Sequence, residues 1–372
     1  MLKINKFWFR TTCIGCAFSV VFFATNASAL VLIQDASVAF GTDFDSNPQM
    51  TDDKQSLQRY FITPRYSISA YDNQDRWYSN ASLRIQRSSD KQLAVDREDP
   101  TINIGWEREQ DKGRLSVFTS YVKNSTRITE FDGTGLVVSD GASVTRSIGA
   151  NWQRFITDKI NFTLGGQYLK TDFSGGSNFT NFSTKSLNSS INYALSDRIN
   201  PYVQVGYTEF NTDTAGSEVT KSQSYLAGAN FVITPRLNIN AGYGITHISD
   251  IGNGKNINSG LSYLGERYQL RGAVARSVSP SAIGRFQESD RLTLAYGYDL
   301  SEKSRLGADF TWRINNTLNS VRTKQLTSFY ARDLSDYWQM RLSLQFRELE
   351  SDNVNTNGET LGLSLTYNTP EF

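Results

Sequence analysis

The chain has very few of the residues from which covalent and metal chemistry is built. It holds two cysteines and one histidine in 372 residues. Cys13 and Cys16 lie close to the N-terminus, so thiolate ligands and Cys–His pairs are excluded from the rest of the chain. For His247 we can nominate no partner serine as a nucleophile. We therefore predict no enzyme, no metal site and no cofactor.

Long hydrophobic runs and an excess of one charge are also missing. No apolar run after residue 29 reaches 18 residues, which excludes membrane-spanning helices. Lys and Arg number 38 against 37 Asp and Glu, so we expect no nucleic-acid partner. The mean hydropathy is −0.43, yet 12% of the residues are aromatic, which argues against disorder. Many half-apolar strands explain this combination.

The N-terminus has the three parts of a secretory signal peptide. Three basic residues precede a short apolar stretch at 11–24, and Ala27-Ser28-Ala29 is a small-x-small cleavage site. We therefore expect cleavage near Ala29, and we divide the chain into a signal peptide (1–29) and a single domain (30–372).

The rest of the chain repeats a period-2 pattern. In LNINAGYGIT (237–246), apolar or aromatic residues alternate with Asn, Gly and Thr, so a strand here has one apolar and one polar face. INFTLGGQY (160–168), LGADFTWRI (306–314) and MRLSLQF (340–346) behave alike. We find no segment with helical periodicity after residue 29.

Short polar turns alternate with longer polar loops between these segments, as in outer-membrane barrels. This spacing predicts an all-β, transmembrane, antiparallel up-and-down barrel of eighteen strands. The predicted strands are 32–45, 57–71, 76–87, 101–110, 114–126, 144–156, 160–173, 183–195, 199–210, 220–233, 237–250, 256–264, 267–278, 288–300, 304–314, 321–334, 338–349 and 358–368. The strands 256–264 and 321–334 alternate less cleanly, so sixteen strands are the alternative.

The polar face indicates which side of the wall meets lipid. A soluble barrel of this width needs an apolar filling, whereas a wide membrane barrel holds water inside. A closed barrel also satisfies every strand amide in hydrocarbon. We therefore expect the apolar face to contact outer-membrane lipid of a Gram-negative bacterium, with Tyr and Trp near the strand ends at the interfaces.

Strand parity then assigns the charged residues that face the lumen. The predicted pore-lining residues are Arg65, Arg84, Glu107, Arg271, Asp309, Arg313, Arg341 and Arg347. Glu109 and Asp299 share the inward parity. Because basic side chains lower the barrier for negative solutes, we expect a mild anion preference. Mutual salt bridges across the wall are the alternative use of these charges. The longest loop, 127–143, is a candidate for an inward constriction.

Two short motifs resemble those of known bacterial barrels. Residues 360–367 (TLGLSLTY) resemble the insertion signal on the last strand, with Gly362, Leu365 and Tyr367 at its defined positions; this implies the barrel assembly machinery as a partner. Residues 40–48 (FGTDFDSNP) are similar to the first strand and loop of a family of outer-membrane β-barrel porins associated with exopolysaccharide synthesis and export. A structural turn explains the same residues without any family.

The resemblance implies an export pore for exopolysaccharide, with periplasmic export components as partners. The residues alone indicate a pore, which leaves a general or substrate-selective uptake porin for small solutes as the alternative. A barrel with a structural or surface role is a further alternative. The sequence does not separate these classes.

Overall fold

The structure of the chain is a computed structural model. It describes residues 30–370 except 135–139, 176–178, 215–217, 250–251, 282–283, 317–320 and 352–353. The predicted signal peptide therefore lies outside the described residues.

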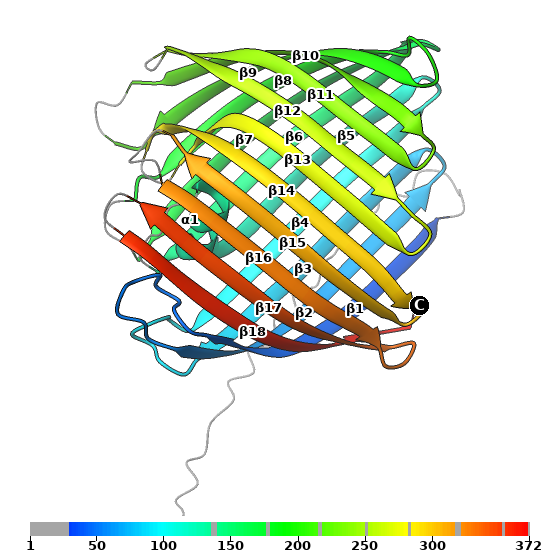
Figure 1. The fold of residues 1–372 in the computed structure, drawn as a ribbon. Helices are drawn as coiled ribbons and strands as arrows, with labels where there is room; N and C mark the ends of the chain where they lie inside the picture. Colours follow the sequence, from blue (N-terminus) through cyan, green and yellow to red (C-terminus); the bar gives the residue numbers. More distant parts are fainter. Residues whose placement is uncertain are drawn as a thin grey trace, which may run out of the picture.

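The described chain forms a closed antiparallel barrel of eighteen strands (Figure 1). The strands are β1 (Val31–Asp45), β2 (Leu57–Asp72), β3 (Asp75–Ser88), β4 (Arg97–Gln110), β5 (Gly113–Ser125), β6 (Ala142–Thr157), β7 (Ile160–Ser174), β8 (Phe182–Tyr193), β9 (Ile199–Thr212), β10 (Thr220–Thr234), β11 (Leu237–Ile248), β12 (Gly252–Leu264), β13 (Tyr268–Pro280), β14 (Phe286–Ser301), β15 (Ser304–Asn315), β16 (Val321–Asp333), β17 (Trp338–Ser351) and β18 (Val354–Asn368). Each strand pairs with its neighbours in sequence, and β1 closes the ring against β18. The prediction of eighteen strands is confirmed, and the alternative of sixteen is wrong.

The wall has an apolar outer face and a polar inner face. Outward residues such as Tyr243, Ile245 and Leu344 are 51–58% exposed, because no protein layer covers them. The residues that alternate with them along the strand, such as Gly244, lie on the inner face. Among the described residues, no helix is long and apolar enough to cross a membrane.

Some strands run further toward the long loops than the sequence predicts. β4 begins at Arg97 rather than residue 101, and β12 begins at Gly252 rather than residue 256. These added residues are polar or glycine, apart from Pro100. They lie beyond the apolar stripe, so alternation does not reveal them, but their backbones continue the hydrogen-bonded ladder.

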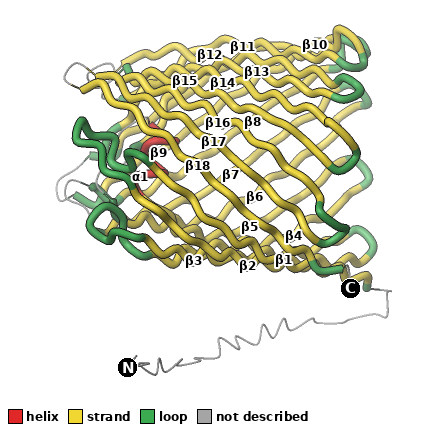
Figure 2. Tube along the Cα trace, turned by 60° about the horizontal axis from the view of Figure 1, so that its bottom comes forward, coloured by secondary structure: helices red, strands yellow, loops and turns green. Residues whose placement is uncertain are grey.

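One helix departs from the prediction that no helix follows residue 29. α1 (Thr126–Thr134) directly follows β5, inside the predicted loop 127–143, and lies at the long-loop end of the barrel (Figure 2). Its sequence, TRITEFDGT, contains three threonines and a glycine, which are weak helix formers. Packing against the barrel therefore stabilises α1, and a nine-residue helix leaves little periodicity for a sequence pattern to detect.

Candidate lumen site

The pairing register places all eight predicted pore-lining residues on the inner face. They belong to β2 (Arg65), β3 (Arg84), β4 (Glu107), β13 (Arg271), β15 (Asp309 and Arg313) and β17 (Arg341 and Arg347). For example, Arg341 is paired with Ser364 and Arg271 with Ser262, whereas the adjacent residues Leu342 and Leu270 face outward. The structure does not bring the eight together at one point. It divides them between a packed cluster near α1 and a more open part of the lumen.

α1 is held inside the barrel by arginines on both sides. Arg313 of β15 is 3% exposed and donates a hydrogen bond to the carbonyl oxygen of Phe131 at 2.9 Å. Arg127 of α1 donates to the carbonyl oxygens of Pro48 and Leu93 in two other loops, at 3.3 and 3.2 Å. β15 lies far around the ring from β5, where α1 begins. α1 therefore extends into the lumen and narrows it, as the sequence predicted for loop 127–143.

A second arginine from the barrel wall, Arg97, fixes the segment at the base of α1. Arg97 of β4 is buried, and its guanidinium donates to the carbonyl oxygen of Gly141 at 2.7 Å and to Asp99. Asp140 lies 3.6 Å from the same guanidinium and accepts a hydrogen bond from Ser125 at 3.0 Å. Both ends of the segment that contains α1 are thus attached to the wall.

A buried ion-pair network adjoins α1. Asp45 is fully buried, and Arg347 donates to both of its carboxylate oxygens at 2.7 Å. Arg59 contacts Asp45 at 3.2 Å and also pairs with Asp43. Arg84 extends the network, with a nitrogen 3.9 Å from Asp43. Arg347 is therefore structural here, because it pairs with the buried Asp45 carboxylate, whereas Arg84 lies at the edge of the network with its side chain 41% exposed.

A cavity of about 260 Å³ separates α1 from this part of the wall. Its lining includes Phe131 and Arg127 from the α1 side and Asp45 and Gln345 from the strands. Burial lowers the pKa of the Arg127 guanidinium from its ordinary value. This small, charge-lined cavity is part of the packing between α1 and the wall. A solute would have to pass on the other side of α1.

Three of the predicted arginines are instead open to the lumen. Arg65, Arg271 and Arg341 are exposed, and none has an ion-pair partner among the described residues. Asp309 is also exposed, and of the two predicted acids it is the one without an ion-pair partner in the described ranges. Glu107 differs, because it lies 3.4 Å from Arg76. The lumen therefore presents full positive charges at three separate strands.

Aromatic rings position two of the inner-face arginines. The Arg341 guanidinium carbon lies 3.9 Å from the centre of the Phe329 ring, and a Cβ at Gly307 would overlap that ring. The ring therefore lies flat over Gly307, with Arg341 stacked on it. Arg84 stacks on Phe61 in the same manner at 4.1 Å. Arg341 is thus held near the wall while its charge stays unpaired.

The inner face of β6–β12 has a different chemistry. Within the described ranges, no inward side chain of these seven strands is charged. Asn, Gln, Ser and Thr dominate instead, as in the paired Asn230 and Asn240. The lumen therefore has a charged sector, which contacts α1, and an uncharged sector on the opposite side.

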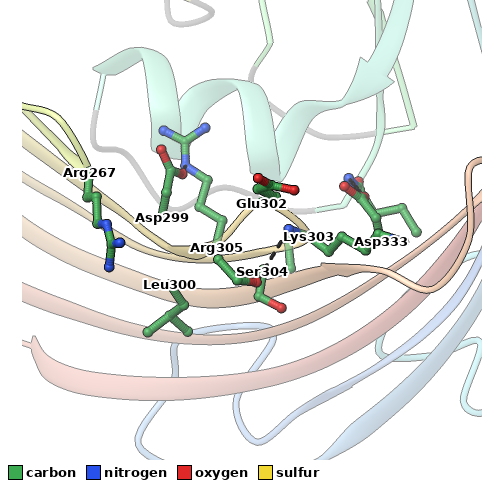
Figure 3. Close-up of a pocket in the computed structure, with 11 residues that line it drawn as sticks. Arg267, Asp299, Leu300, Glu302, Lys303, Ser304, Arg305 and Asp333 are labelled. Carbon is green, nitrogen blue, oxygen red and sulfur yellow. Dashed lines mark hydrogen bonds and ion pairs between the residues drawn. The ribbon is translucent and has the colours of Figure 1, made fainter.

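The short-turn end of the barrel holds a wider cavity of about 800 Å³ (Figure 3). Arg305 and Asp299, direct partners on β15 and β14, lie side by side in its lining, with Nε and Oδ1 3.6 Å apart. Lys303 and Glu302 come from the turn between β14 and β15. This mouth is lined by balanced charge, so it is not itself a selective site.

The two motif segments are part of the barrel closure. Gly362, Leu365 and Tyr367 lie on β18, where Gly362 faces the lumen opposite Asp43 and the other two face outward. In the segment 40–48, the Asn47 amide donates to the Asp45 carboxylate at 3.1 Å. Both residues are at most 1% exposed, so the segment forms a buried capped turn.

Comparison with known proteins supports the fold over most of the chain. Residues 109–264 match the family described as outer membrane protein beta-barrel domain. The outer membrane protein OpdK of Pseudomonas aeruginosa superposes with a TM-score of 0.55 at 7% identity, covering 92% of this chain and 99% of that one. OccK5 (OpdH) of the same species gives 0.53 at 12% identity, covering 91% and 98%. No curated protein matches the sequence.

A siderophore receptor also matches over most of this chain. A variant of the ferric enterobactin receptor PfeA of Pseudomonas aeruginosa gives a TM-score of 0.50 at 9% identity, with 93% of this chain and 81% of that one covered. These matches show that the chain has the fold of outer-membrane β-barrels, here with an apolar outer face and a polar lumen. None of these matches carries an association with exopolysaccharide.

Sequence reasoning missed the residues that hold α1. Asp43, Asp45 and Arg59 have inward parity, so alternation alone identifies them as lumen residues. Arg127 and Phe131 lie outside any strand and leave no periodic signal. Their role depends on contacts with residues far away in the sequence.

Proposed function

We propose that the chain is a diffusion channel through which small solutes enter across the outer membrane, with a preference for anions. The observation that carries this proposal is the docking of α1 inside a polar lumen. A constriction built from a wall-tethered loop sets a size limit, and it leaves the rest of the lumen polar for hydrated solutes. The uncharged sector of β6–β12 provides hydrogen-bonding side chains on the far side of α1, below a hydrophobic cluster that includes Phe182, Phe210 and Ile248.

The anion preference depends on Arg65, Arg271 and Arg341. An unpaired guanidinium facing water raises the local anion concentration, and the low-dielectric wall strengthens its field. The buried pairs around Asp45 contribute little to this field, because each cation there has a carboxylate within contact distance. The alternative, in which the inner-face charges form salt bridges with one another, thus applies to the arginines near α1 but not to Arg65, Arg271 and Arg341.

The test is the reversal potential of the refolded channel in a potassium chloride gradient across a planar bilayer. We expect chloride to permeate more readily than potassium, and Arg341→Ala to reduce the ratio. Lys324→Ala is the matched control, because Lys324 faces outward and pairs with Glu348 at 3.1 Å. A channel that favours potassium, or equal effects of the two variants, would contradict the anion preference.

Exopolysaccharide export is the second candidate, and it depends on the resemblance of residues 40–48 alone. In the described residues this segment has a structural use, as a capped turn. Uptake therefore has the stronger support. Insertion by the barrel assembly machinery through β18, and cleavage of the signal peptide near Ala29, complete the proposal.

A further inference from the structure

The outer face of the barrel carries an unusual run of cations near the long loops. Lys123, Arg146, Lys170 and Lys185 lie on β5, β6, β7 and β8 and share the outward parity; we call them the basic stripe. Arg146 is directly opposite Lys170. Lys123 is opposite Val144, which is two residues from Arg146. Lys185 is opposite Tyr168, which is two residues from Lys170. Direct and diagonal neighbours are both within reach of long side chains.

At two other places on the outer face, a cation is directly opposite an acid. Arg276 is the direct partner of Asp290 on β13 and β14, and Lys324 is the direct partner of Glu348 on β16 and β17. Directly opposed like charges such as Arg146 and Lys170 destabilise a sheet. The Arg146–Lys170 pair therefore differs from these two pairs, which points to an anion outside the chain.

Three acids lie beside the four cations of the stripe. Asp172 serves two cations, with carboxylate oxygens 2.5 Å from Arg146 and 3.7 Å from Lys170. Lys170 is also 3.6 Å from Asp213, and Lys185 is directly opposite Glu209 at 3.9 Å. Lys123 has no ion-pair partner among the residues that the structure describes. The Arg146 side chain is 55% exposed, so its guanidinium has donors available for a further acceptor.

The height of the stripe identifies what that acceptor is. The Arg146 guanidinium carbon lies 5.7 Å from the centre of the Tyr121 ring, and Tyr168 is 41% exposed on the outer face. Outward tyrosines mark the edge of the apolar band, so the stripe lies at the level of the lipid headgroups on the long-loop side, which is the extracellular leaflet. Phosphate esters are the headgroup anions that Arg and Lys bind best.

We propose that the basic stripe is a binding site for the phosphate groups of a phosphorylated glycolipid in the outer leaflet. Arg146 and Lys170 bind one phosphate between them, which removes the repulsion across the β6–β7 pair. Lys123 and Lys185 flank this position and extend the site to a second phosphate. This site is independent of transport, because all four side chains face away from the lumen.

The experiment is native mass spectrometry of the full chain in a nonionic detergent, with diphosphorylated lipid A as the probe and its dephosphorylated form as the comparison. The test variant is Arg146→Ser/Lys170→Ser. Arg322→Ser/Lys324→Ser is the matched control, because it removes the same number of outward cations from β16, where each opposes a glutamate. Heat-modifiable gel mobility verifies that each variant is folded.

We expect wild type and control to bind the diphosphorylated lipid, and the test variant to bind about tenfold more weakly. The dephosphorylated lipid should bind weakly to all three. Equal binding of the two lipids to wild type would overturn the proposal, as would equal weakening of the test variant and the control. A test variant that remains folded and binds like wild type would also overturn it.

Discussion

The attachment of α1 to β15 offers a direct test of the constriction. Arg313→Ala removes the donor that contacts the carbonyl oxygen of Phe131 at 2.9 Å. Phe131 lies in the last turn of α1, where carbonyl groups have no partner within the helix and where the helix dipole favours a cation. Both effects make Arg313 a stabilising contact for the docked helix.

The magnitude follows from the burial of this contact. A hydrogen bond from a charged donor contributes about 1.5–3 kcal/mol, so its loss favours the undocked helix by roughly 2 kcal/mol. This shifts the ratio of docked to undocked α1 by about thirtyfold. Because α1 narrows the lumen, single-channel recordings of Arg313→Ala should show higher conductance and more frequent transitions than the wild type.

The control for lost charge is Arg341→Ala. Arg341 is also an inner-face arginine, but its guanidinium stacks on Phe329 and has no contact with α1 among the described residues. This variant should change ion selectivity and leave the fluctuations unchanged. If Arg313→Ala folds and conducts like the wild type, then α1 does not limit the pore and the reasoning is wrong.

Three further outcomes follow from the wall, a loop and the chain end. Gly244→Ala should impair folding, because its Cβ would overlap the carbonyl oxygen of Tyr225. Gly166→Ala is the control: no atom lies closer than 3.8 Å to its Cβ, so it should refold normally, as measured by gel mobility. The amide of Ser88 lowers the pKa of Asp96 in the second long loop, so this contact stabilises the loop fully above the ordinary carboxyl pKa and is lost as the pH falls through the lowered pKa. Hydrogen exchange in this loop, relative to the intrinsic rate, should rise only under those acid conditions. Tyr367→Ala should slow insertion by the assembly machinery in a reconstituted assay while leaving spontaneous refolding in detergent unchanged.

The strands were predictable because a membrane barrel repeats one physical constraint at every position. Each inward side chain meets water and each outward one meets lipid, so alternation survives in a segment such as 237–246 without long-range information. The same constraint placed Arg271, Arg313 and Arg341 on the inner face. Strand ends were less predictable, since above the apolar band both faces are polar and β12 begins four residues before its alternation does.

The use of each charge was not predictable, because parity says nothing about distance. Arg341 and Arg347 share a strand and a face, yet Arg341 is open to the lumen while Arg347 binds Asp45, 302 positions away in the sequence. That partner is brought close by the closure of β1 against β18. The ring must therefore be complete before the two arginines acquire different roles.

The separation of charge inside the barrel has a physical reason in the loops. Where α1 and the first two long loops fold inward, they exclude water, and a charge there must have a partner; Asp45 and Arg347 are such a pair. The strands β6–β12 face no such helix, so their amides and hydroxyls can stay hydrated without pairing. An unpaired arginine is stable only where water remains, as it does around Arg65 and Arg341. The proposed anion preference thus depends on those few charges that the inward loops leave solvated.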